Sequence, residues 1–171
     1  MLRHLASKIR SRRRSSQAGY SLIELVITVG MILIVTTFAL PSFLNYLRSS
    51  RVQAGARTVS AYLNEGRQMA IKTNGPVCVA HTTSTMQFQT STCGGAVIFA
   101  PGLSGSAGNI RLPDNVTLSV TSGSSAIFQP LGNAAGTTYT VTDVPSGRTL
   151  RVIVAASGRV CLASATATAC P

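Results

Sequence analysis

A long apolar segment near the N-terminus constrains this chain more than any other feature of its sequence. It runs from Ser21 to Leu44 and contains 24 residues. At about 1.5 Å per residue, a helix of that length spans roughly 36 Å, enough to cross a hydrocarbon core of about 30 Å. Pro41 lies near its end, where proline removes one helical hydrogen bond and favours a kink. The segment predicts one membrane-spanning helix.

The residues before this segment are strongly basic. Residues 1–19 hold six Lys or Arg, more than half of the formal net charge of +11. Positive charge beside a span is typical of the cytoplasmic side, so this basicity does not indicate nucleic-acid affinity. An ordinary secretory signal peptide is the alternative interpretation. Its apolar region would be shorter, and residues 39–42 substitute poorly for its small-x-small cleavage site.

One carboxylate, that of Glu24, lies just inside the apolar segment. An acid in mid-span costs about 2.5–3.5 kcal/mol on insertion scales, so an acid at the mouth of a span usually has a function. The simpler alternative is an interfacial acid that sits near the lipid headgroups.

Residues 19–25, Gly-Tyr-Ser-Leu-Ile-Glu-Leu, resemble the processing site of type IV pilins and type II secretion pseudopilins. In that family a prepilin peptidase cuts after the glycine and methylates the new N-terminus. The resemblance implies loss of the leader 1–19, cleavage between Gly19 and Tyr20, and N-methylation of Tyr20. Most members have Phe after the glycine, and Tyr20 keeps the aromatic ring.

The same resemblance implies roles in assembly for two residues of the segment. Glu24 becomes the fifth residue of the mature chain, where the family carries its glutamate. In a filament it would pair with the methylated amine of Tyr20 on the adjacent subunit, and such a pair in low dielectric selects one axial offset. Pro41 is similar in place to the proline at which family helices loosen on leaving the lipid.

After the span (20–44), the helix is expected to continue through residues 45–74 as an amphipathic half. Apolar residues at spacings of three and four draw one stripe, and residues 74–76, Asn-Gly-Pro, end the helix. The stripe predicts packing of this half on the chain's own head; it comprises Val52, Ala56, Val59, Leu63, Gly66 and Ala70.

Residues 76–171 change to short β-branched or alternating segments punctuated by Gly, Ser, Asn and Pro. They predict a periplasmic antiparallel β head, with a loop at 101–109 and a turn at 122–125. The predicted fold class is therefore α+β, with a long N-terminal helix packed on a C-terminal antiparallel β head, as in pilins. The expected strands are 77–80, 86–89, 96–99, 116–120, 126–128, 138–141, 149–154 and 160–162.

Four short segments of the predicted head resemble one branch of this family, the GspH/FimT branch of minor pseudopilins and minor pilins. That branch implies a subunit taking part in initiation or at the tip of a type II secretion pseudopilus or type IV pilus. Implied partners are other minor and major pilins, prepilin peptidase, an inner-membrane assembly platform and, before assembly, membrane lipid. The implied location is the bacterial inner membrane, single-pass with a cytoplasmic N-terminus and periplasmic head, and then the filament. The four segments are residues 127–132, 138–141, 151–154 and 157–160.

DNA binding for natural transformation is the alternative function. Some FimT-like members bind DNA through a GRxR motif, and residues 158–161 read Gly-Arg-Val-Cys, with cysteine replacing the second arginine. Arg148, Arg151 and Arg159 are the DNA-binding candidates, because phosphate binding needs a basic cluster more than one spacing. The simpler interpretation is three solvated arginines. An aromatic stacking set is missing, so sequence-specific single-strand recognition is not expected.

The four cysteines all lie in the predicted exported head. An even number in an oxidising compartment favours disulfides, and nearest-neighbour pairing is one of three connectivities that the sequence leaves open. The spacings of 15, 68 and 9 match no zinc template, so no metal site is expected. The disulfide candidates are Cys78, Cys93, Cys161 and Cys170.

Catalysis is not expected. Beyond Glu24 the acids lie in separate segments, and the two histidines are His4 in the leader and His81 in the head. No Ser/His/Asp or Cys/His set can be assembled without His81. The sequence contains no phosphate-binding loop and no GxGxxG motif, so no cofactor is predicted.

Overall fold

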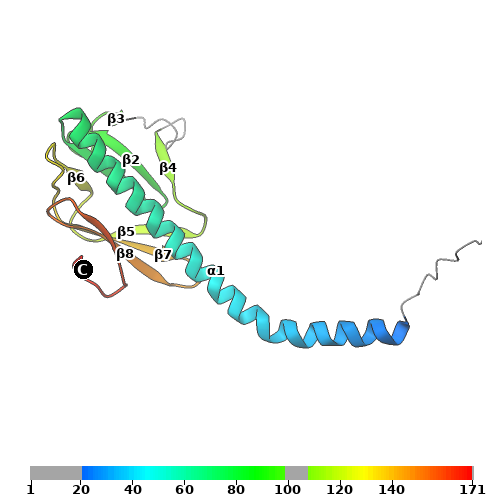
Figure 1. The fold of residues 1–171 in the computed structure, drawn as a ribbon. Coiled ribbons are helices and arrows are strands. Elements are labelled where there is room, and N and C mark those ends of the chain that lie inside the picture. Colours follow the sequence, from blue (N-terminus) through cyan, green and yellow to red (C-terminus); the bar gives the residue numbers. More distant parts are fainter. Residues whose placement is uncertain (1–20, 99–107, 171) are drawn as a thin grey trace, which may run out of the picture. The chain divides into compact units, whose positions relative to one another are not determined.

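A computed structural model describes residues 21–98 and 108–170 of the chain. The predicted leader, the Gly19–Tyr20 cleavage site, His4 and most of the predicted 101–109 loop lie outside the described residues. One helix, α1 (Leu22–Thr73), precedes nine described strands (Figure 1). These are β1 (Val77–His81), β2 (Thr85–Thr90), β3 (Val97–Ile98), β4 (Asn109–Arg111), β5 (Val116–Ser122), β6 (Ala126–Phe128), β7 (Thr137–Asp143), β8 (Thr149–Val154) and β9 (Val160–Ala163).

The chain divides into two compact units, residues 1–41 and residues 42–171. The second unit, called the head below, contains the rest of α1 and all nine strands. Helix α1 ends where Asn74 adopts a left-handed conformation with φ of 49°. The amide of Gly75 then donates to the carbonyl of Ala70 at 3.2 Å, which satisfies one of the last helical carbonyls. The predicted Asn-Gly-Pro stop is thus confirmed.

Two antiparallel sheets form the head. The first, sheet A, has the order β3-β2-β1-β6, with β4 also paired to β2, and the second, sheet B, has the order β5-β7-β8-β9. The sheets are joined at the β1–β2 turn, where the amide of Leu118 in β5 donates to the carbonyl of Thr83 at 2.8 Å. The predicted α+β fold with an antiparallel head is confirmed, and its strands are divided between two sheets.

The predicted apolar stripe of α1 is buried throughout its length, with Gly55 added to it. Helix α1 crosses both sheets (Figure 1), and its two buried glycines mark the closest approaches. A Cβ atom at Gly55 would lie 2.8 Å from Val116 Cγ1 of sheet B, and one at Gly66 would lie 2.6 Å from Val79 Cγ2 of sheet A. Glycine is therefore needed here for close packing, although it weakens the helix itself.

Leucine at position 66 is expected to destabilise the head by about 2–3 kcal/mol, because the added side chain has to displace Val79 and Phe88 from a filled core. Ala61→Leu is the matched control, because Ala61 is exposed on the same helix. Chemical denaturation of both variants measures the difference. Equal stability of the two would show that the helix–sheet contact is not tight at Gly66.

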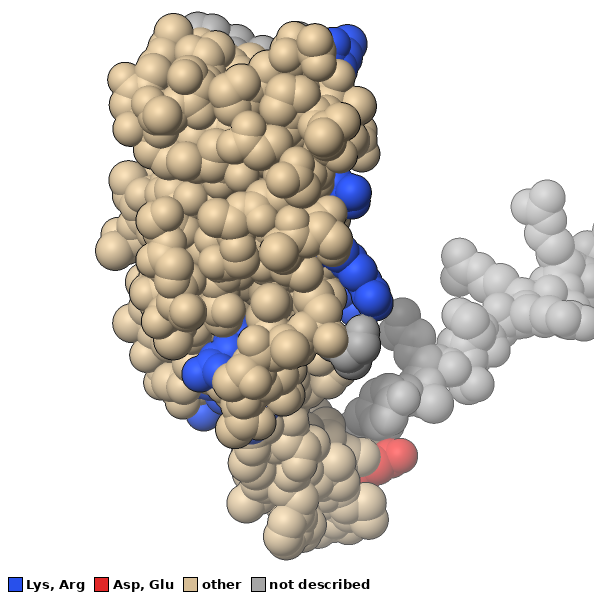
Figure 2. All heavy atoms as spheres, turned by 90° about the vertical axis from the view of Figure 1, so that its left-hand side faces the viewer, with Lys and Arg blue, Asp and Glu red and all other residues tan. Residues whose placement is uncertain are grey.

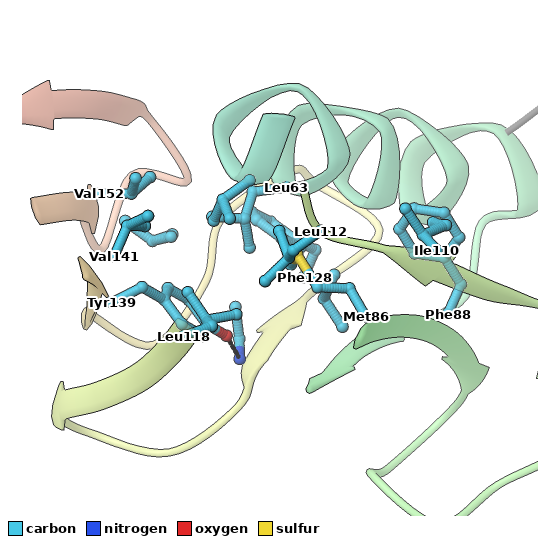
Figure 3. Packing of buried hydrophobic residues seen from close by; sticks show 14 of the residues in the cluster. Leu63, Met86, Phe88, Ile110, Leu112, Leu118, Phe128, Tyr139, Val141 and Val152 are labelled. Atoms are coloured by element: carbon cyan, nitrogen blue, oxygen red, sulfur yellow. Dashed lines mark hydrogen bonds between the residues drawn. The ribbon is translucent and has the colours of Figure 1, made fainter. Parts of the chain in front are cut away.

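The core lies between α1 and the two sheets. In Figure 3, Leu63 points from the helix towards side chains of both sheets, among them Phe128 and Tyr139. Tyr139 is wholly buried, and its hydroxyl accepts a hydrogen bond of 2.7 Å from the amide of Ala126, which links β7 of sheet B to β6 of sheet A. Burial raises the pKa of Tyr139 to about 12, so the phenol stays protonated.

One described strand differs from expectation. Strand β4 pairs with β2 in the register Met86↔Ile110, whereas the sequence pattern predicts that a loop ends at Asn109 and predicts no strand at Ile110. Three residues give too short a pattern to indicate a strand by alternation. Burial of Ile110 against the core of sheet A holds β4 in place.

Candidate assembly and binding sites

The apolar first half of α1 is almost wholly exposed in the described part of the chain. An 18-residue window of it has a mean hydropathy of 2.4 and is 0% buried, and Phe38 alone is 76% exposed. By length and composition this helix can cross a membrane. Leaving each large apolar side chain in water costs about 1.5–3 kcal/mol relative to burial. The segment therefore needs lipid or neighbouring helices.

Glu24 lies in the first turn of α1 and is exposed. It is the only charged residue between Ser21 and Leu47, so the chain's own segment offers it no counter-charge. A carboxylate near a helix N-terminus is favourable because the helix dipole is positive there. In lipid or between apolar helices, however, it would still need a cationic partner.

Pro41 lies inside α1 without ending it. Proline has no amide hydrogen, so the carbonyl of Thr37 loses its usual helical donor. The hydroxyls of Thr36 and Thr37 both donate to the carbonyl of Leu33, at 2.9 and 2.8 Å. These side chains are satisfied inside the helix, but such back-bonding tends to bend helices. The helix is thus weakened over one turn before Pro41.

The three arginines proposed for DNA binding lie in different parts of sheet B and its turns. Arg148 precedes β8, and its Nη1 donates to the carbonyl of Asn45 on α1 at 3.4 Å. Arg151 lies inside β8, three residues further along. Its Nη1 donates to the carbonyl of Ala167 in the C-terminal segment at 2.9 Å. Arg159 lies in the turn at the other end of β8. DNA binding by this set stays a prediction.

The C-terminal segment explains the position of Arg151. After β9 the chain folds back along sheet B, where Ile153 is 5% exposed although it lies outside the main core. The bond from Arg151 to Ala167 and the disulfide between Cys161 and Cys170 hold this segment down. We conclude that Arg151 has a structural contact within the head.

Two disulfides form in the head, Cys78–Cys93 and Cys161–Cys170. Of the three connectivities that the sequence left open, this is the nearest-neighbour one. The first closes 15 residues and ties β1 to the loop after β2. A loop of that length is worth about 3 kcal/mol in the chain-entropy account.

A close junction that sequence reasoning missed lies where α1 meets two loops. Gly158 has φ of +76°, and a Cβ atom there would overlap the carbonyl oxygen of Gly132. That same oxygen accepts a hydrogen bond of 2.9 Å from Nε of Arg67 on α1. The junction joins the helix, the β6–β7 loop and the β8–β9 turn. Gly132 and Gly158 lie in two of the segments that resemble the GspH/FimT branch, 127–132 and 157–160. The sequence of these segments does not indicate that the two glycines are in contact.

His81 is the histidine of the head that a catalytic set would need. His81 lines a groove of about 290 Å³ with Gln87 and Asn109. Its Nδ1 lies 3.2 Å from Ser125 Oγ, and its ring packs edge-on against Tyr139. Burial lowers the pKa of His81, which favours the neutral ring. Within residues 21–98 and 108–170, no group of three His, Cys, Asp or Glu could hold a metal ion.

The surface of the head is basic and otherwise mostly uncharged. Residues 42–171 contain nine Lys or Arg and three Asp or Glu. In Figure 2, Lys and Arg lie along the margins of a broad surface without charge, and they far outnumber Asp and Glu. Of the three acids, Asp143 is wholly buried, and one of its oxygens accepts hydrogen bonds from the amide and hydroxyl of Ser146.

A long helix that is apolar and exposed in its first half, and packed on an antiparallel β head in its second, defines the pilin-like class of fold. Within that class, residues 55–158 match the type II transport protein GspH family. The match covers more than half of the chain, which therefore belongs to that family. It is a family of pseudopilins, which are structural subunits and not enzymes. No curated protein matches the sequence significantly.

Solved structures show the same fold at low sequence identity. The solution structure of Escherichia coli GspH superposes with a TM-score of 0.56 at 11% identity, covering 70% of this chain and 92% of that one. The minor pseudopilin EpsH from the type 2 secretion system of Vibrio cholerae gives 0.52 at 14% identity, covering 68% and 99%. The type IV minor pilin FimU of Pseudomonas aeruginosa gives 0.53 at 12% identity, covering 68% and 91%.

Proposed function

We propose that this chain is a minor pseudopilin that takes part in initiation or at the tip of a type II secretion filament. In this proposal prepilin peptidase removes residues 1–19 and methylates Tyr20. The mature chain is inserted in the inner membrane with its head in the periplasm, and it is then incorporated into the filament beside other pilin subunits. The inner-membrane assembly platform is its further partner.

The observation that carries the proposal is the division of α1 into two kinds of surface. The second half is buried against the head, whereas the first half exposes nearly all of its apolar side chains. A permanent anchor would explain the exposed half, but it would not explain the charge of Glu24 at its start. A helix that moves from lipid into contact with the helices of other subunits, with Glu24 setting the register, accounts for both the exposed half and the charge.

Mass spectrometry of the chain from cells with an intact secretion system tests the processing step. We expect the mature N-terminus at Tyr20 with one added methyl group, and we expect the leader to persist when the peptidase is deleted. A chain that keeps residues 1–19 in wild-type cells, or one cut after the apolar segment, would overturn the proposal. The second result would indicate the signal-peptide alternative.

A further inference from the structure

The β6–β7 loop presents an unusual side chain to solvent. Leu131 is 91% exposed, the highest value for a large hydrophobic residue in the described part of the chain. It occupies the third position of a turn in which the amide of Gly132 donates to the carbonyl of Gln129 at 2.8 Å. Polar residues or glycine usually fill such positions. A leucine here loses about 1.5–3 kcal/mol relative to burial, so a partner would gain from covering it.

Hydrogen bonds hold the backbone of the turn that carries Leu131. The amide of Gln129 donates to the carbonyl of Asn133 at 2.8 Å, which closes the base of the loop. The carbonyl of Gly132 is held by Arg67 and lies against Gly158. Because the backbone is already ordered, binding at Leu131 would cost little conformational entropy.

The surroundings of Leu131 are apolar at the centre and basic at the rim. Ile71 of α1 is 51% exposed, and its Cδ1 would lie 3.0 Å from a Cβ atom at Gly132, so it packs against the turn. Arg67 contacts the turn directly, and Arg159 follows Gly158 in the same junction. The acid nearest to Arg67 in sequence, Glu65, lies about 160° away around the helix.

We propose that these four residues form a docking surface, the Leu131 knob (Leu131, Ile71, Arg67 and Arg159), for a second subunit of the same filament. The partner surface would be an apolar pocket with an acidic rim. An apolar anchor beside arginine is the composition typical of energetically dominant interface positions. The acidic rim follows from charge complementarity, because residues 42–171 carry a net charge of +6. This inference rests on the proposed function.

Two other occupants suit the knob less well. One exposed leucine and one half-exposed isoleucine bury too little apolar area for stable membrane binding, which takes more than one strong anchor. Nucleic acid would engage the arginines through its phosphates, but the protruding leucine at the centre adds nothing to that contact. Both remain distinguishable in the test.

The test places a photo-crosslinking amino acid at position 131 of the full chain, in cells that assemble the filament. We expect a crosslink to another pilin subunit of the same system. We also expect Leu131→Asp to reduce recovery of the chain in the filament at least tenfold. Val144→Asp is the matched control, because Val144 is 58% exposed at the β7–β8 turn, and it should change recovery less than twofold. Both variants should unfold at the temperature of the wild type.

The inference is overturned if Leu131→Asp enters the filament as well as Val144→Asp does. It is also overturned if position 131 crosslinks only to lipid, only to nucleic acid or to nothing. A Glu24→Leu variant run in parallel separates this failure from that of the proposed function. If Glu24→Leu blocks incorporation while Leu131→Asp does not, only the knob is refuted. If the wild-type chain itself is absent from the filament, the proposed function fails and the knob fails with it.

Discussion

Replacing Gly158 with alanine is expected to destabilise the head by about 3 kcal/mol or more. Two effects add at this position. The left-handed backbone, with φ of +76°, costs a non-glycine residue about 1–2 kcal/mol. The new methyl group would also overlap the carbonyl oxygen of Gly132, which is backbone and cannot rotate away. Relief requires the β6–β7 loop to move, and that movement breaks the hydrogen bond from Arg67.

Gly147→Ala is the control that separates the two effects. Gly147 also has a left-handed backbone, with φ of +67°, but a Cβ atom there would meet nothing within 4 Å. It should therefore lose only the conformational contribution, about 1–2 kcal/mol. Denaturant unfolding of the oxidised chain in detergent, followed by circular dichroism, measures both variants. If the two lose equal stability, the Gly132–Gly158 contact contributes nothing beyond backbone strain.

The helical part of the fold could be predicted because its signal is long and local. The stripe from Val52 to Ala70 repeats over five turns, and every member is buried as expected. Strand pairing is different, because the partners are far apart in sequence. The alternation in β7, Thr137–Asp143, predicts a strand with one buried face, but it does not say whether β5 or β1 lies beside it.

The contacts of the candidate binding residues could not be predicted either, because their partners are also far away in the sequence. Arg148, Arg151 and Arg159 look alike in the sequence, yet one contacts α1, one holds the C-terminal segment and one lies in the turn before β9. Leu131 gave no signal, because its exposure and its neighbours are known only from the fold. Leu131 is a binding candidate because Ile71, sixty positions earlier in the sequence, packs against the same turn. Only the fold brings the two residues together.

Both halves of α1 follow one physical rule, which is that apolar surface must be covered. The head covers its half with two sheets that come close enough to require glycine at positions 55 and 66. The first half leaves Leu22 81% exposed and Ile34 65% exposed, so the described residues of the chain do not cover it. We therefore propose that the charge of Glu24 inside this surface makes assembly selective.

Substituting Glu24 with leucine is accordingly expected to block incorporation into the filament while leaving leader cleavage intact. The substitution removes an acid that costs about 2.5–3.5 kcal/mol in a span, so membrane insertion itself should improve. Between packed apolar helices, the carboxylate would face the methylated amine of Tyr20 on a neighbouring subunit. Losing one partner of a buried charge pair costs about 3–5 kcal/mol, which lowers the association constant about 100-fold or more.

Three further variants show whether the charge of Glu24 is responsible. Glu24→Gln keeps the shape of the side chain and removes its charge, so it should block incorporation into the filament as Glu24→Leu does. Glu24→Asp keeps the charge and should retain part of the incorporation. Thr28→Leu adds the same apolar side chain one turn later, where the native hydroxyl bonds only to its own helix at Leu25, and it should assemble normally. Filament recovery and the mass of the mature N-terminus are measured together for each variant. Normal assembly of Glu24→Gln would mean that the carboxylate charge does not set the register, and Glu24 would then be an interfacial acid near the headgroups.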